Sequence, residues 1–239
     1  MKRYLFILCC FFTFISCKED PLITFKETSI TDGNNSAVEV NIPLAEGDTP
    51  AVNSINSIIK NKVIASLQIG EYDDDSKIET IKKSIDAFNQ EFDAFKNDFP
   101  DSDRHWEAQI DGDIMYQSES LISIALTSYM DTGGAHGNLN ISFLNFNAKT
   151  GKLIANTDLF NDKKAFFKLA KTYYQNNIDE KDAVFDSENF VLPANIGYTE
   201  DGIILLYNTY EIAAYSAGTI EFTIPYDDVN SLLVFDTTQ

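Results

Sequence analysis

The chain has 239 residues, of which 44% are hydrophobic, so it can bury one good core or two small ones and is not an intrinsically disordered chain. Thirty-seven Asp and Glu against 18 Lys and Arg give a formal net charge of −19. Such an acidic chain lacks the basic surface that nucleic acids or anionic lipids require, and it favours a cationic partner.

The N-terminus has the features of a secretory signal. Lys2 and Arg3 precede an apolar run over residues 4–15, which is shorter than the roughly 20 residues of a spanning helix. The segment ends Phe14-Ile15-Ser16-Cys17 and resembles the lipobox of bacterial lipoproteins, in which the cysteine is lipidated. We expect a signal peptide over residues 1–16 and a lipid anchor on Cys17; an ordinary cleaved signal is the alternative.

Residues 17–21 are expected to form a tether. Lys18-Glu19-Asp20 resembles the tag that sends lipoproteins of some Gram-negative bacteria to the outer face of the outer membrane. We therefore expect an outer-membrane protein, displayed on the surface or facing the periplasm. No cysteine follows Cys17, so the mature domain has no internal disulfide and no thiolate metal site.

The first half of the mature chain predicts a hairpin and two helices. The hairpin comprises residues 22–30, a polar turn at 32–36 and residues 37–44. A helix should begin at Pro50 with Thr49 as its N-cap and end near residue 69. A second helix should follow the capping box Ser76-Lys77-Ile78-Glu79. Its stripe of Ile and Phe is either a face packed on a sheet, which we favour, or a coiled-coil seam.

The remaining elements are mostly strands. An antiparallel meander is predicted over residues 106–110, a hairpin turn at Asp111-Gly112-Asp113, and residues 114–117, 121–130 and 139–147. Next come a turn at 149–152 and a helix with an aromatic face at 166–174. The last part predicts a closing helix at 226–233, preceded by strands at 190–192, 195–199, 203–209 and 219–225. Helices alternate with blocks of antiparallel strand, so the predicted class is α+β, with antiparallel sheets, helices packed on them and two adjoining subdomains.

Two segments supply candidate ligand-binding residues. The run from Tyr129 to Asn138 places Gly133, Gly134 and His136 between two strands, which suits either a backbone ligand nest or a tight strand connection. Tyrosine offers a broad contact area and a hydroxyl group, so an aromatic and acidic cluster near a strand end suits recognition of a protein or sugar, with core packing as the alternative. That cluster comprises Tyr207, Tyr210, Glu211 and Tyr215.

Catalytic and metal signatures are missing from the sequence. It has no His-Glu-x-x-His, Gly-x-Ser-x-Gly or P-loop motif, and its two histidines are 31 residues apart. The acidic runs at 71–75 and at Asp111-Gly112-Asp113 lack the spacing of a calcium loop, and we interpret them as a solvated approach to a helix and a turn. We expect no catalytic residue, no metal site and no cofactor.

Several ordered blocks resemble the RsiV/PdaC family of bacterial envelope proteins. Val38-Glu39-Val40-Asn41-Ile42-Pro43 is similar to the start of the PdaC-like domain. The signature of the family is similar to three further blocks, namely Asp131 to Asn138, Asn145 to Lys152 and Asp158-Leu159-Phe160. The end of the RsiV-like domain is similar to Asp201-Gly202-Ile203, Tyr210 to Gly218 and Ile224-Pro225-Tyr226. The resemblance implies a PdaC-like domain over residues 22–138 and an RsiV-like domain over 139–239.

The resemblance also implies binding rather than catalysis. In RsiV the extracellular part recognises lysozyme, and in PdaC these modules accompany a separate deacetylase domain that needs paired aspartates and a His-x-x-x-His motif, absent here. We expect a non-catalytic envelope lipoprotein that binds a cationic, lysozyme-like protein. Binding of peptidoglycan or another glycan is the alternative, and an unrecognised hydrolase or deacetylase is a more distant one. The oligomeric state is left open.

Overall fold

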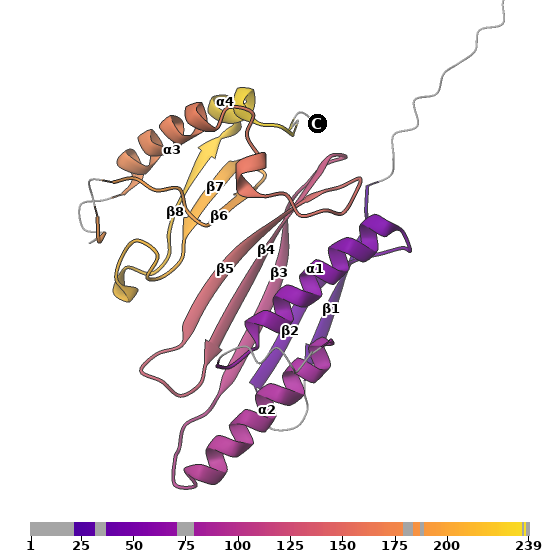
Figure 1. Ribbon diagram of the computed structural model, residues 1–239, viewed down its shortest axis with the longest axis vertical. Coiled ribbons are helices and arrows are strands. Elements are labelled where there is room, and N and C mark those ends of the chain that lie inside the picture. Colours follow the sequence, from indigo (N-terminus) through magenta and orange to yellow (C-terminus); the bar gives the residue numbers. More distant parts are fainter. Residues whose placement is uncertain are drawn as a thin grey trace, which may run out of the picture.

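The computed structural model describes residues 22–31, 37–70, 79–178, 184–186, 189–235 and 237. The expected signal peptide, Cys17 and tether lie outside these residues, as do the turn at 32–36 and the acidic run at 71–75. The described chain forms a five-stranded sheet of order β1-β2-β3-β4-β5 and a three-stranded sheet of order β6-β7-β8, which lie side by side in Figure 1. The α+β class predicted from the sequence is confirmed.

The five-stranded sheet contains one parallel pair among antiparallel ones. Its strands are β1 (Phe25–Thr31), β2 (Ala37–Ala45), β3 (Glu107–Gln117), β4 (Leu121–Asp131) and β5 (Asn138–Asn147). The predicted hairpin pairs β1 with β2, and β3, β4 and β5 form the predicted antiparallel meander. β2 and β3 are parallel, because two helices carry the chain between them. Crossovers of this length are what a parallel pair requires.

The two crossover helices begin at threonine caps. In α1 (Pro50–Ser66) the Thr49 hydroxyl accepts from the Val52 amide, as the sequence predicts. α2 (Ile81–Asp98) begins later than predicted, because Thr80 rather than Ser76 is its N-cap and accepts from the Lys83 amide. Ser76 lies outside the described residues, and Glu79 precedes the helix.

β3 runs straight through the segment predicted to be a hairpin turn. Asp111 and Asp113 pair with β4 as ordinary strand residues, so the predicted turn is wrong. Gly112 is needed instead for a close approach, since a Cβ there would lie 2.7 Å from Cδ of Pro43. Asp111 accepts a hydrogen bond of 3.0 Å from the Asn41 amide on β2. The sequence Asp-Gly-Asp therefore serves the parallel β2–β3 contact rather than a reversal of the chain.

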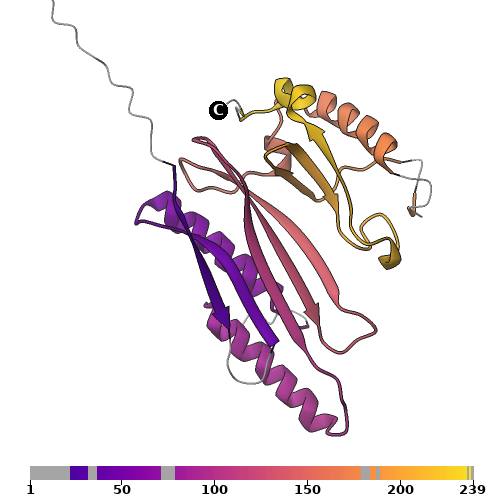
Figure 2. The ribbon, with the colours of Figure 1, turned by 180° about the vertical axis from the view of Figure 1, so that it is seen from behind.

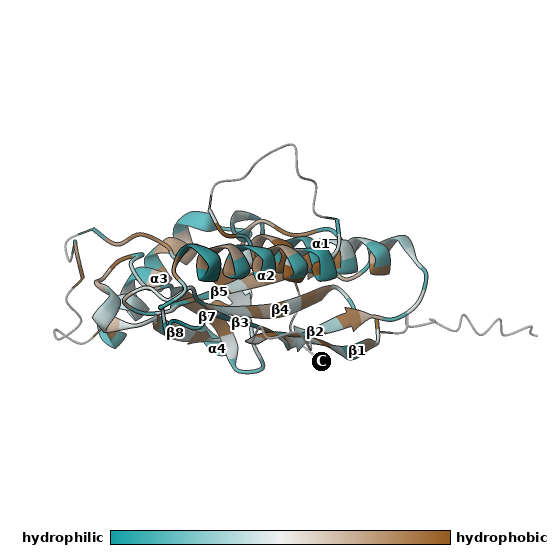
Figure 3. Cartoon of the chain, turned by 90° about the horizontal axis from the view of Figure 1, so that it is seen from below, coloured by the Kyte–Doolittle hydropathy of each residue, from teal (hydrophilic) through white to brown (hydrophobic). Residues whose placement is uncertain are grey.

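Helices α1 and α2 cover one face of the five-stranded sheet, as a layer above the strands in Figure 3. The first core lies between them and includes Ile55, Ile59 and Phe88 with Ile110 and Ile124. The aromatic stripe of α2 packs into this core at its N-terminal end, as we favoured. Further along, Phe92 and Phe95 pack on Trp106, with ring centroids 5.7 and 5.4 Å from the indole, and Phe99 is 58% exposed.

The second subdomain packs helices on the three-stranded sheet. It comprises α3 (Lys163–Asn177), β6 (Asn195–Tyr198), β7 (Gly202–Tyr207), β8 (Ile220–Pro225) and the short α4 (Tyr226–Val229). Its core joins side chains of the sheet to Phe160, Phe166 and Ala170. Residues 190–192, predicted as a strand, pair with no strand; Phe190 instead packs on α3 through Phe167 and Tyr174.

Side-chain hydrogen bonds join the subdomains along β4 and β5. The Asn145 amide donates to the Ile196 carbonyl at 2.8 Å, and the Tyr198 backbone amide donates to the Ser123 hydroxyl at 3.1 Å. The Asn208 side chain bonds both the amide and the carbonyl of Ile141 at 2.8 Å. β5, which begins at the boundary expected between the two domains, thus belongs to the first sheet and carries much of the junction.

No helix within the described residues is long and apolar enough to cross a membrane.

Candidate functional site

The tip of the β4–β5 hairpin holds the predicted glycine loop in a defined shape. Gly133 has a φ of 76°, and its amide donates to the Asp131 carboxylate at 2.8 Å. A Cβ at Gly133 would lie 2.9 Å from Cδ of Arg104, whose guanidinium donates to the Gly134 carbonyl at 3.3 Å. The glycine is thus required by the backbone conformation and by the packed arginine.

A second turn, from Asn208 to Glu211, reaches the hairpin tip from the other subdomain. The Glu211 amide donates to the Asn208 carbonyl at 3.0 Å. Both carboxylate oxygens of Glu211 accept backbone hydrogen bonds, at 2.9 Å from Asn208 and at 2.7 Å from Ala194. Tyr210 sits in this turn with a φ of 68° and is the one non-glycine residue with positive φ in the described chain. Its side chain is 56% exposed.

The two turns bring three rings together, which we call the His136 cluster: His136, Tyr210 and Tyr215. The rings of His136 and Tyr215 stack with centroids 3.6 Å apart and planes 17° apart. Tyr210 lies 5.7 Å from Tyr215 and 6.5 Å from His136. The Tyr215 hydroxyl donates to the Gly137 carbonyl at 3.0 Å, which fixes the stack on the hairpin. Segments more than 70 residues apart in sequence therefore build one surface feature.

Not all of the predicted site residues join this cluster. Tyr207 is fully buried, its hydroxyl donates to the Val191 carbonyl at 2.6 Å, and burial raises its pKa above the ordinary range of tyrosine. Glu211 acts through its backbone hydrogen bonds as a support for the Tyr210 turn. Gly133 and Gly134 shape the hairpin tip. The rings that face solvent come from His136, Tyr210 and, in part, Tyr215.

Sequence reasoning missed the acidic side chains beside the cluster. Tyr129 packs on Gly137, and burial, Asp131 and Glu107 each raise its pKa, with a smaller contribution from Tyr215. Glu107 and Asp131 are direct cross-strand partners. Their proximity could not be read from the sequence, because a turn predicted at Asp111-Gly112-Asp113 breaks the β3–β4 register that pairs them.

The acidic pair continues into a row along β3. Glu107, Asp111 and Asp113 alternate with inward residues, so they point away from α1 and α2. In Figure 2 this face of β1, β2 and β3 is seen from the front, with both helices behind the sheet. Within the described residues the only ion pair joins Lys163 to Asp158, at 3.6 Å. The acidic row therefore has no cationic partner within the described chain.

A pocket of about 340 Å³ opens on the opposite, helix-covered side of the hairpin. Its lining comes from the end of α1 and from β4, the tip and β5: Ser66, Gln68, Ser128, Met130, Thr132, Gly134, His136, Asn138 and Asn140. Only His136 and Gly134 of these were predicted site residues. His136 thus belongs both to the pocket wall and to the aromatic cluster.

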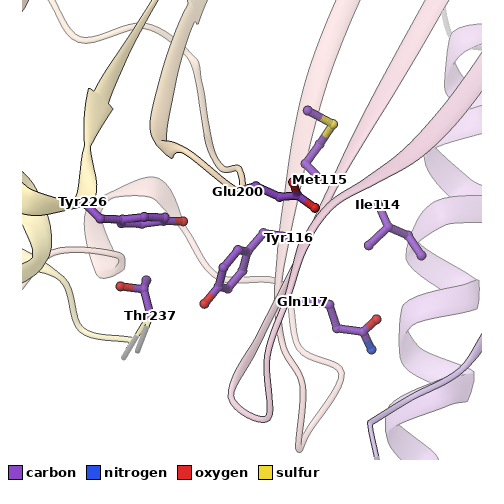
Figure 4. A pocket seen from close by; sticks show the side chains of 7 residues that line it. All are labelled: Ile114, Met115, Tyr116, Gln117, Glu200, Tyr226 and Thr237. Carbon is purple, nitrogen blue, oxygen red and sulfur yellow. The ribbon is translucent and has the colours of Figure 1, made fainter. Parts of the chain in front are cut away.

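A second pocket, of about 500 Å³, lies where β3 meets the second subdomain (Figure 4). Tyr116 from β3 and Tyr226 from α4 point into it from opposite sides, and Glu200 reaches it from the β6–β7 turn. The strand register shifts between Ile114 and Tyr116, which re-aims these side chains. No group of three or more His, Cys, Asp or Glu in the described ranges is placed to hold a metal ion.

Each subdomain contains a segment that matches a known family model. Residues 30–139 match the family model "Deacetylase PdaC", and residues 157–227 match "Protein of unknown function (DUF3298)". Among curated proteins the chain has no match.

Two solved structures share the fold. A DUF3298 family protein from Pseudomonas aeruginosa PAO1 is 22% identical, with a TM-score of 0.60, and the match covers 90% of this chain and 95% of that one. A member of the same family from Bacteroides fragilis NCTC 9343 is 19% identical, with a TM-score of 0.61, covering 90% and 94%.

The fold is therefore that of a two-subdomain α+β protein, shared with these two structures. The N-terminal part of the chain matches the PdaC model and the C-terminal part matches the DUF3298 model, in the order expected from the sequence.

Proposed function

We propose that the chain is a non-catalytic, lipid-anchored protein of the bacterial envelope that binds a cationic, lysozyme-like protein. The observation that carries the binding proposal is the His136 cluster, an exposed group of rings beside the unneutralised acidic pair Glu107 and Asp131. The absence of catalysis and the anchor at Cys17 rest on the sequence alone, through the missing motifs and the lipobox.

The conformation of Tyr210 supports a role in binding. A bulky residue at positive φ costs on the order of 1–3 kcal/mol, which glycine would avoid. The surrounding hydrogen bonds of Glu211 nevertheless hold this residue in place with most of its ring in solvent. Rigid exposed tyrosines supply much of the contact energy in protein interfaces at a low entropy cost. The turn therefore presents a contact residue at the expense of stability.

The charges beside the cluster favour a cationic partner. Glu107 and Asp131 lie directly opposite each other in the sheet, a placement that is unfavourable for two like charges. A lysine or arginine placed between them would remove this repulsion and could also pack on the faces of Tyr129 and Tyr215. The net charge of −19 would speed the approach of such a partner.

Binding to lysozyme at about 0.15 M salt, where the Debye length is about 8 Å, tests the proposal. The domain from residue 22 should bind measurably in calorimetry. Tyr210→Gly keeps the backbone conformation and removes the ring, and it should weaken binding by about tenfold or more. Glu107→Gln should also weaken binding, mainly through slower association.

Matched variants separate recognition from bulk charge. Phe99→Ala removes an equally exposed ring at the end of α2, and Glu91→Gln removes an exposed acid from the same helix; neither should change the affinity. Cytochrome c, an unrelated cationic protein, should bind much more weakly than lysozyme. If Glu91→Gln and Glu107→Gln lower the affinity equally and Tyr210→Gly has no effect, the interaction is nonspecific ion pairing.

The anchor is tested separately in the full chain. Cys17→Ala should abolish fatty-acid labelling and release the protein into the soluble fraction, because buried acyl chains contribute roughly 0.8 kcal/mol per CH₂ to membrane attachment. Cys10→Ala is the matched control and should leave the labelling unchanged. Persistent membrane association of the Cys17→Ala protein would disprove the lipid anchor without touching the binding proposal.

A further inference from the structure

We propose that the pocket between the end of α1 and the β4–β5 hairpin binds a neutral saccharide. The pocket is distinct from the acidic surface proposed above for a protein partner. Ser128 and Met130 on β4 face the helices, whereas Tyr129 between them faces the opposite side with Tyr215. The two sites therefore use opposite sides of one hairpin and meet only at His136.

The described residues that line the pocket include no Asp, Glu, Lys or Arg, although 23% of the residues in the chain are charged. Three side-chain amides, those of Gln68, Asn138 and Asn140, surround the opening together with three hydroxyl groups. A charged ligand would lose its hydration without meeting an opposite charge, which is costly. The lining thus selects an uncharged ligand with many hydroxyl or amide groups.

Several of these polar groups are available to a ligand. The side chains of Gln68 and Asn138 make no hydrogen bond with the described residues, and neither does that of Thr132. Asn140 uses its Nδ2 to bond the Ser142 hydroxyl at 3.3 Å, which leaves its Oδ1 as an acceptor. Amides both donate and accept, so they match the hydroxyl groups of a sugar, which do the same.

Apolar contact in the pocket comes from Met130 and the ring of His136. The stack on Tyr215 and the contact of His136 Nδ1 with the Gly137 carbonyl, at 2.9 Å, hold this ring in one orientation. The C–H face of a pyranose ring is apolar and can pack on such a fixed surface while its rim of hydroxyls meets the amides. A volume of about 340 Å³ lies at the lower end of small-molecule sites, which limits the pocket to a short saccharide segment.

Ligand-observed NMR with three probes tests the proposal on the domain from residue 22. The probes are chitotetraose and maltotetraose, which are neutral, and a trimer of galacturonic acid, which is charged. At least one neutral probe should give saturation transfer, and the acidic probe should give none. The double variant Gln68→Ala/Asn138→Ala should lower the affinity for the neutral probe by about tenfold, whereas Gln90→Ala/Asn97→Ala, which removes exposed amides from α2, should leave it unchanged.

Three results would overturn the proposal: no transfer to either neutral probe, stronger binding of the acidic probe, or equal loss of affinity in the two double variants. Thermal unfolding of each variant shows whether it is folded, and Thr132→Val provides a second, milder change in the same wall. Tyr210→Gly and Glu107→Gln should leave saccharide binding unchanged. Failure of the saccharide site is therefore distinguishable from failure of the protein-binding proposal, which those two variants test.

Discussion

At the scale of single residues, two buried tyrosines differ in whether their hydroxyl group contributes to the stability of the fold. Tyr198 and Tyr207 are both fully buried on neighbouring strands of the three-stranded sheet. The Tyr207 hydroxyl donates to the Val191 carbonyl, whereas the Tyr198 hydroxyl has no hydrogen-bond partner among the described residues. A buried polar group without a partner costs about 1–3 kcal/mol.

Phenylalanine at these two positions should therefore have opposite effects. Tyr198→Phe should leave stability unchanged or raise it by up to about 1 kcal/mol, and Tyr207→Phe should lower it by about 1–2 kcal/mol, because it leaves the Val191 carbonyl unpaired. Urea unfolding at neutral pH measures both. A clear loss of stability in Tyr198→Phe would show that its hydroxyl is satisfied.

The same residues predict alkaline instability. Burial raises the pKa values of Tyr198, Tyr207 and Tyr226 above the ordinary range. Above a pH of about 10 the unfolded chain releases phenolic protons that the folded chain still holds, so the free energy of unfolding should fall as the pH rises. Tyr198→Phe should reduce this fall.

At the scale of elements, Gly112 sets the distance between the parallel strands β2 and β3. A methyl group at this position would lie 2.7 Å from Cδ of Pro43, a ring atom that cannot rotate away. Gly112→Ala should destabilise the protein by about 1–3 kcal/mol. Gly134→Ala is the matched control, since its Cβ would meet only the His136 carbonyl oxygen, at 3.7 Å, and should change stability by less than about 0.5 kcal/mol. Equal unfolding midpoints for the two variants would contradict this account.

Local signals predicted the elements better than their pairing. Thr49 and Pro50 mark the start of α1 correctly, because Thr49 is its N-cap and Pro50 its first residue. Polar and apolar side chains alternate over residues 25–31 and 37–45 clearly enough to predict the hairpin. The turn predicted at Asp111-Gly112-Asp113 is wrong because this sequence is compatible both with a turn and with a close approach of two strands. The position of Pro43 in the fold, which the sequence does not give, decides between them. His136, Tyr210 and Tyr215 could be singled out one by one, but the stack that joins them depends on long-range register.

At the scale of the whole molecule, the chain carries a large excess of negative charge, with a formal net charge of −19. Among the described residues one ion pair is found. Self-repulsion should therefore destabilise the folded chain, and sodium chloride should screen it. Raising the salt from about 0.02 to 0.5 M should increase the melting temperature, by about 2–4 °C for each kcal/mol recovered. A melting temperature that is flat or falls with salt would show that the charges lie too far apart to repel.

The bond between Asn208 and Ile141 has a consequence for association. β5 is the last strand of its sheet, and such an edge offers free backbone groups on which a strand of another molecule can add. The Asn208 amide occupies the donor and the acceptor of Ile141, and the second subdomain thereby blocks the middle of this edge. At the other edge, Lys26 and Glu27 place exposed charges of both signs on β1. A side chain of the second subdomain thus covers backbone groups on which a strand of another molecule would otherwise pair.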